Sequence, residues 1–80
     1  MSTSAIKSEP TGVEATIDEL ALRVRLSDGR EITVPLAWFP RLAEASREAR
    51  EHWRWIGGGI GIHWPELDED LSIRGLLLGR

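Results

Sequence analysis

The sequence predicts a small α+β domain: a small antiparallel sheet, made of a three-stranded meander and a second hairpin, with a central helical segment and a short C-terminal helix. Three observations predict this class. Apolar and polar residues alternate over residues 13–17, 21–26 and 31–34, which is the period of half-buried strands. Apolar residues recur at spacings of three and four over residues 39–53, as in an amphipathic helix. A glycine cluster then separates two further short apolar segments.

The chain has 80 residues, enough for one small domain with a thin core. Residues 1–11 are rich in serine and threonine and are predicted to form a disordered tail, which leaves residues 12–80 as a single α+β domain. There is no cysteine, so neither disulfides nor thiolate zinc sites can stabilise this domain. No apolar run is long enough to span a membrane and no signal peptide is apparent, so we expect a cytoplasmic protein.

The first meander carries the strongest local signal. Asp-Gly at residues 28–29 lies between two alternating segments, and glycine accepts the positive φ that a tight hairpin turn requires. The alternation places Arg23 and Arg25 on the solvent-facing side of the hairpin. We expect them to pair across the strands with Glu31 or Thr33.

The centre of the chain is predicted to be helical. Pro35 ends the preceding strand, and Pro40 suits a first helical turn. The helical pattern continues to about Trp53, although Ser46 can act as an N-cap and divide it into two short helices.

The C-terminal third is predicted to contain a hairpin and a helix. Two short strands, over residues 54–56 and 61–63, are joined by a glycine turn, and Pro65 stops the second strand. Residues 66–70 are predicted to form an acidic loop. Ser72 is a predicted N-cap for a last helix over residues 73–78, whose leucines either fold back onto the sheet or form a contact surface.

The same segments resemble an uncharacterised bacterial family, domain of unknown function 2442. The resemblance covers roughly residues 16–79. It is carried by Leu-Ser-Asp-Gly-Arg-Glu-Ile-Thr-Val-Pro-Leu at 26–36, by Pro-Arg-Leu-Ala-Glu-Ala at 40–45, and by a long run at 61–77. The most specific part of that run is Ile-His-Trp-Pro-Glu-Leu-Asp-Glu-Asp.

The resemblance implies the α+β fold predicted above. It also implies a partner-binding role, because many members are encoded beside another small protein in what looks like a toxin–antitoxin pair. Some members carry a helix-turn-helix extension, and no such extension is expected in this chain. The family has no established catalytic residue to carry over.

The motifs of the C-terminal third admit several chemistries. The acidic residues Glu66, Asp68, Glu69 and Asp70 lack the spacing of a calcium loop and are expected to serve the turn and the last helix. His63 with Asp68 or Asp70 could form a general-base pair, but no serine or cysteine nucleophile accompanies it, so a structural histidine is favoured.

Two other ligand sites are not expected. His52 and His63 lack a third ligand at metal-site spacing. The cluster at residues 57–59 is followed by a strand instead of a helix, which favours a hairpin turn over a phosphate-binding loop.

The four tryptophans are the remaining unusual feature. Trp38, Trp53, Trp55 and Trp64 cannot all be fully buried in so short a chain, and exposed tryptophans are enriched in protein interfaces. Trp53 and Trp55 share one face of the predicted strand. Core packing and interface contact remain open alternatives for these side chains.

We expect a non-enzymatic protein-interaction module, antitoxin-like, with a protein partner encoded nearby and with self-association into a homodimer. We expect no cofactor, no metal ligands and no catalytic residues. The candidate partner-binding residues are Trp53, Trp55, His63, Trp64, Asp68, Glu69, Asp70, Leu76 and Leu77. An acidic loop would suit a basic partner surface.

Two alternatives belong to other classes of function. One is a transcriptional regulator whose arginines contact phosphates: Arg23, Arg25, Arg47, Arg50 and Arg54. The net charge of −3 makes a nucleic-acid partner the less favoured expectation. The other is a small hydrolase that uses His63 and Asp68.

Overall fold

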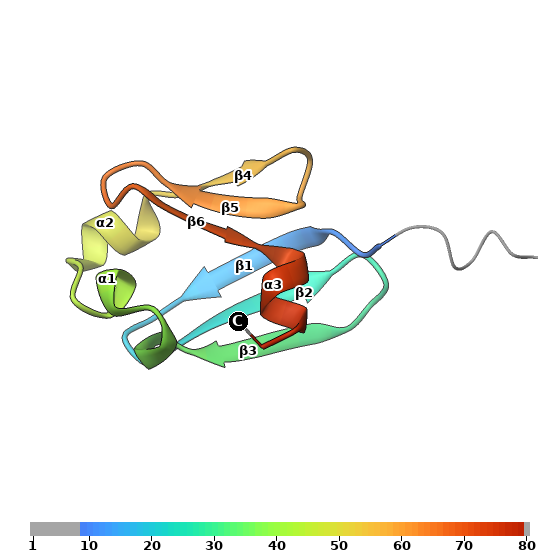
Figure 1. Cartoon of the computed structure of the whole chain (residues 1–80), viewed down its shortest axis with the longest axis horizontal. Coiled ribbons are helices and arrows are strands. Elements are labelled where there is room, and N and C mark those ends of the chain that lie inside the picture. Colours follow the sequence, from blue (N-terminus) through green and yellow to red (C-terminus); the bar gives the residue numbers. More distant parts are fainter. Residues whose placement is uncertain (1–8, 80) are drawn as a thin grey trace, which may run out of the picture.

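The computed structural model describes residues 9–79, which form two antiparallel three-stranded sheets and three short α-helices (Figure 1). The first sheet has the order β1-β2-β3 and the second β4-β5-β6, so each is a simple meander. The predicted α+β class is confirmed. The strands are β1 (Gly12–Ile17), β2 (Ala21–Leu26), β3 (Glu31–Pro35), β4 (Arg54–Ile56), β5 (Gly61–Trp64) and β6 (Glu69–Ser72).

Both turns of the first meander follow from local side-chain chemistry. Asp18 closes the β1–β2 turn, because its Oδ1 accepts hydrogen bonds from the backbone N–H groups of Leu20 (2.8 Å) and Ala21 (2.9 Å). Gly29 forms the β2–β3 turn with a φ of 94°. The predicted hairpin is therefore confirmed.

The predicted partners of the two β2 arginines are wrong. Arg23 pairs with Asp18 (2.9 Å) and Arg25 with Glu14 (2.7 Å), instead of with β3. Both carboxylates come from the other side of β2, where β1 runs antiparallel and places Glu14 opposite Arg25. All four side chains are at least two-fifths exposed, so each pair adds little stability.

The central segment is divided, as Ser46 suggested. After a 3-10 helix, η2 (Leu36–Trp38), come two α-helices, α1 (Pro40–Ala43) and α2 (Arg47–Glu51). Ser46 Oγ accepts a hydrogen bond from the backbone N–H of Ala49 (3.1 Å) and so caps α2. The division turns the chain so that α1 and α2 lie together at one end of the molecule (Figure 1).

The second sheet has three strands, one more than the predicted hairpin. Residues 69 and 70, expected in an acidic loop, begin β6, where His63 lies opposite Asp70 and Trp64 lies opposite Glu69. The turn before β6 contains Asp68 in the left-handed region, at φ 51°. Pairing with β5 has overcome the low strand preference of acidic residues.

The core lies between the two sheets and under the last helix. The first sheet contributes Leu22, Val24, Leu26 and Val34, and the second contributes Ile62, Trp64 and Leu71. The last helix, α3 (Ile73–Leu77), adds Ile73 and Leu76 and packs on β3. As predicted, Ser72 caps this helix, with its Oγ accepting from Gly75 N–H at 2.9 Å.

A direct hydrogen bond joins the two sheets at the glycine turn. Gly12 N–H donates to the carbonyl oxygen of Gly59 at 2.7 Å. A Cβ atom on Gly59 would lie 2.5 Å from the carbonyl oxygen of Gly12, and one on Gly12 would lie 2.5 Å from the Trp55 ring. The two glycines therefore permit a backbone approach that no side chain would allow.

Most of the predicted N-terminal tail, residues 1–8, lies outside the described residues. At its end, Thr11 exchanges two hydrogen bonds with Ser27: its N–H donates to Ser27 Oγ (3.0 Å) and its carbonyl oxygen accepts from Ser27 N–H (2.8 Å). These bonds hold the start of β1 against the β2–β3 turn.

Candidate functional site

The candidate partner-binding residues divide into buried and exposed groups. Trp64 and Leu76 are 0% and 3% exposed, so neither side chain lies on the surface offered to a partner. Trp64 also donates its indole N–H to the carbonyl oxygen of Arg50 at 2.8 Å, which ties β5 to α2. The alternation of side chains along a strand indicates this burial, because Trp64 lies two residues after the buried Ile62.

Two further tryptophans, Trp53 just before β4 and Trp55 within it, are partly buried. Trp53 and Trp55 pack edge to face, with ring centroids 5.1 Å apart, and both lie against the core. The contact between the two rings is consistent with the predicted shared face, although Trp53 precedes the strand. They contribute mainly to packing, with only part of each ring in contact with solvent.

The histidines of this region pair with single carboxylates. His63 Nδ1 contacts Asp70 Oδ1 across β5 and β6, and His52 Nδ1 lies 2.7 Å from Glu66 Oε2. The carbonyl oxygen of Asp68 accepts a hydrogen bond from Arg41 at 3.3 Å. The His63–Asp68 pair of the hydrolase hypothesis is therefore replaced by a cross-strand His63–Asp70 pair.

No group of three histidine, aspartate or glutamate side chains is arranged to hold a metal ion within residues 9–79. The glycine cluster at residues 57–59 forms the predicted hairpin turn, with positive φ at all three positions. Ser72, the hydroxyl nearest in sequence to the His63–Asp70 pair, is engaged as the α3 cap.

Three of the five arginines of the regulator hypothesis are paired with carboxylates within the described residues. Arg23, Arg25 and Arg47 each pair with a carboxylate, Arg47 with Glu51 at 3.2 Å. Such pairing cancels the local positive potential on which phosphate binding depends.

Two exposed leucines lie at the C-terminal end of α3. Leu77 is 38% exposed and Leu78 70% exposed, while the neighbouring Leu76 faces the core. The spacing of three between Ile73 and Leu76 marks the buried side of α3, so Leu77 and Leu78 fall outside it.

Among the exposed apolar residues that the sequence analysis did not propose as a site are Leu20 and Trp38, which lie on adjoining segments and are here called the Leu20–Trp38 patch. Leu20 is 77% exposed and Trp38 is 50% exposed. Their segments meet because Leu36 N–H donates to the carbonyl oxygen of Leu20 at 2.9 Å. One general signal was available, because four tryptophans cannot all be fully buried in a chain of 80 residues.

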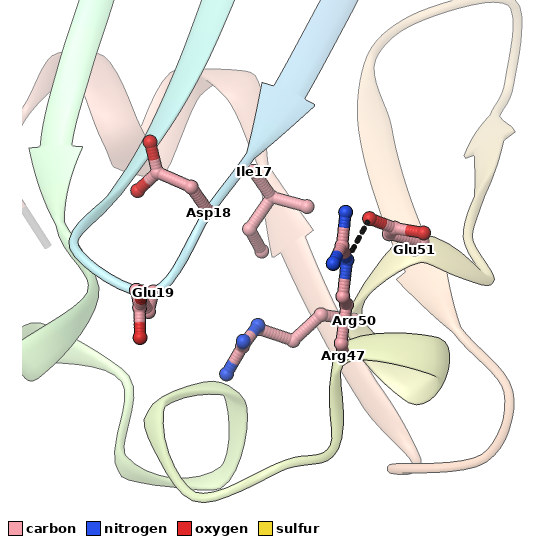
Figure 2. A pocket seen from close by; sticks show the side chains of 6 residues that line it. All are labelled: Ile17, Asp18, Glu19, Arg47, Arg50 and Glu51. Atoms are coloured by element: carbon pink, nitrogen blue, oxygen red, sulfur yellow. Dashed lines mark hydrogen bonds and ion pairs between the residues drawn. The ribbon is translucent and has the colours of Figure 1, made fainter.

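A cleft of about 480 Å³ opens beside the Leu20–Trp38 patch. Figure 2 shows the β1–β2 turn on one side of this cleft and α2 on the other. Its lining residues are Ile17, Asp18, Glu19, Arg47, Arg50 and Glu51. Glu19 directly precedes Leu20, so the cleft and the patch share one turn.

Charge pairing within the cleft is uneven. The hydrogen bond from Arg23, with those from the backbone N–H groups of Leu20 and Ala21, lowers the pKa of Asp18 to about 2. Glu51 pairs with Arg47. Arg50 instead donates to the carbonyl oxygen of Ala45 at 3.0 Å and points toward the β1–β2 turn (Figure 2).

No helix within residues 9–79 is both long enough and apolar enough to cross a membrane.

A family model described as a protein of unknown function (DUF2442) matches residues 10–80 of the chain. No curated protein matches the chain.

Two solved structures share the fold. A crystal structure of a protein of unknown function from Rhodospirillum rubrum is 32% identical, with a TM-score of 0.78 over 90% of this chain and 89% of the other. A solution NMR structure of an uncharacterized protein from Chromobacterium violaceum is 25% identical, with a TM-score of 0.72 over 88% of this chain. The match spans 66% of that second protein.

Proposed function

The chain belongs to the DUF2442 family, and from this membership and its exposed surface we propose that it is a non-enzymatic protein-interaction module, an antitoxin-like partner of a small protein encoded beside it. The observation that carries the proposal is the Leu20–Trp38 patch. A half-exposed tryptophan and a largely exposed leucine on adjoining segments leave apolar area in contact with water. Tryptophan is also the residue type most enriched among binding hot spots.

The patch has the polar surroundings that interfaces usually have. Charged residues of the neighbouring cleft, Glu19 and Arg50 among them, lie beside it and would form part of a polar rim. An apolar centre with a charged rim suits binding to a protein surface.

The acidic surface of the second sheet would be a secondary contact. Asp68 and Asp70 are exposed and Glu69 is partly exposed on the β5–β6 side. His63 is engaged with Asp70, which leaves the other carboxylates to steer a basic partner surface. Leu77 and Leu78 would add apolar contact at the end of α3.

Co-expression of the tagged chain with the product of the adjacent gene tests the proposal. We expect the two proteins to co-purify in a fixed ratio, and we expect Trp38→Ala to abolish co-purification. Ile60→Ala is the matched control, because Ile60 is 58% exposed but lies in the glycine turn of the other sheet.

Failure of the wild-type pair to co-purify would count against the proposal, as would equal loss in the two variants. The mass of the isolated chain, measured by light scattering, addresses self-association separately. If Trp38→Ala converts a homodimer into a monomer, a second copy of the chain occupies the patch and the partner-binding proposal is wrong.

A further inference from the structure

The side chain of Arg50 is bonded to the segment before α2, and its backbone is bonded to the second sheet. Its NH1 group donates to the carbonyl oxygen of Ala45 (3.0 Å), and its backbone carbonyl accepts the Trp64 indole N–H (2.8 Å). Its backbone N–H donates to the carbonyl oxygen of Ser46 at 3.0 Å. The side chain therefore loses little conformational freedom when it binds a further group.

The guanidinium of Arg50 lies near carboxylates but pairs with none of them. Among residues 9–79, no carboxylate oxygen lies within 4.0 Å of an Arg50 nitrogen. Asp18 forms an ion pair with Arg23, and Glu51 forms one with Arg47. One arginine of the cleft thus keeps donors for a ligand, since a guanidinium has five N–H groups and Ala45 accepts one.

We propose that the cleft between the β1–β2 turn and α2 is a binding site for the carboxylate group of a peptide, with Arg50 as the residue that binds it. A guanidinium matches the planar geometry of a carboxylate and forms two charge-assisted hydrogen bonds with it. Ile17, on the cleft wall, offers an apolar contact for the adjoining carbon atoms. The volume of about 480 Å³ is in the range of small-ligand pockets.

The charge of the cleft selects a monoanion. Its walls carry three carboxylates, those of Asp18, Glu19 and Glu51, against two arginines, Arg47 and Arg50. Because Asp18 is paired with Arg23 and Glu51 with Arg47, Arg50 can neutralise the single charge of a carboxylate, whereas a phosphate dianion would keep a second negative charge beside Glu19. This site does not depend on the Leu20–Trp38 patch, so either can be present without the other.

The direct test is an NMR titration of the ¹⁵N-labelled full chain with N-acetyl-leucine, using N-acetyl-leucinamide as the uncharged control. We expect saturable shifts in the amides of residues 17–19 and 49–51, with a dissociation constant on the order of millimolar, and none of these shifts with the amide. N-acetyl-aspartic acid α-amide separates the two sources of carboxylate. Tighter binding of this compound assigns the site to an acidic side chain, and weaker binding assigns it to a peptide C-terminus.

Arg50→Gln should weaken binding of N-acetyl-leucine at least about tenfold. Arg54→Gln is the matched control, because Arg54 is an exposed arginine of β4 outside the cleft, and it should leave binding unchanged. If Arg50→Gln fails to fold, Glu19→Gln still tests the site. Glu19 is exposed and forms no hydrogen bond within the described residues, and its neutralisation should tighten carboxylate binding about twofold or more.

Three results would overturn the site: equal shifts from the acid and the amide, unchanged binding in a folded Arg50→Gln variant, or inorganic phosphate binding more tightly than N-acetyl-leucine.

Discussion

Replacing Gly59 by alanine should destabilise the protein by breaking the junction between its sheets. The Gly59 φ of 108° is a conformation that costs an alanine about 1–2 kcal/mol. The new Cβ would also lie 2.5 Å from the carbonyl oxygen of Gly12, so the two segments must separate. Separation breaks the 2.7 Å hydrogen bond from Gly12 N–H to the carbonyl oxygen of Gly59, which contributes about 1 kcal/mol. The expected loss is roughly 2–3 kcal/mol of unfolding free energy.

Gly58 is the matched control within the same turn. Its φ is 72°, but a Cβ there has no neighbour within 4 Å, so Gly58→Ala should cost only the backbone term of about 1–2 kcal/mol. Urea unfolding followed by tryptophan fluorescence measures both variants. Equal destabilisation by the two substitutions would refute the argument that the Gly12–Gly59 approach joins the sheets.

Three further predictions concern other parts of the structure. Trp64→Phe should cost about 2–4 kcal/mol in urea unfolding, because it shrinks a fully buried side chain and leaves the Arg50 carbonyl without its donor; a cost below about 0.5 kcal/mol would contradict this. Ser46→Ala should cost about 1 kcal/mol by removing the α2 cap, whereas Ser46→Asp should retain most of the stability. The folded-state pKa of Asp18 is about 2, below the ordinary 3.8, so its contribution is complete above pH 3.8 and is lost as the pH falls toward 2. The stability difference between wild type and Asp18→Asn should shrink over that interval, and a constant difference would contradict the assignment.

Local chemistry made much of the fold predictable. Gly29 and the two serine caps, Ser46 and Ser72, act through atoms within three residues, so the sequence alone identifies the turns and helix starts that they form. Strand alternation likewise located the buried face of β2.

The sequence-based predictions were wrong where contacts between distant segments determine the structure. The acidic composition of residues 69–70 indicates a loop, and only pairing with β5 makes them a strand. Arg25 has a glutamate opposite it on each neighbouring strand, Glu14 and Glu31, and the sequence does not determine which one it contacts.

The candidate site was less predictable than the fold. The Leu20–Trp38 patch lies just beyond the β2–β3 pairing, where Ala21 lies opposite Pro35 and Leu36 N–H donates to the carbonyl oxygen of Leu20. The hairpin predicts that these segments adjoin, but not that the two side chains stay exposed. The cleft brings α2 beside the β1–β2 turn, and no periodicity indicates that proximity. Trp64 and Leu76, by contrast, could have been assigned to the core from their spacing to Ile62 and Ile73.

The most direct test of the interaction proposal is a calorimetric titration of the purified neighbouring gene product into wild type, Trp38→Ala and Ile60→Ala. The Leu20–Trp38 patch predicts saturable binding to wild type and a loss of about 2 kcal/mol or more for Trp38→Ala, a rise in Kd of about thirtyfold. Ile60→Ala should bind as wild type does. Absence of binding to wild type, or the same Kd for wild type and Trp38→Ala, would contradict the account.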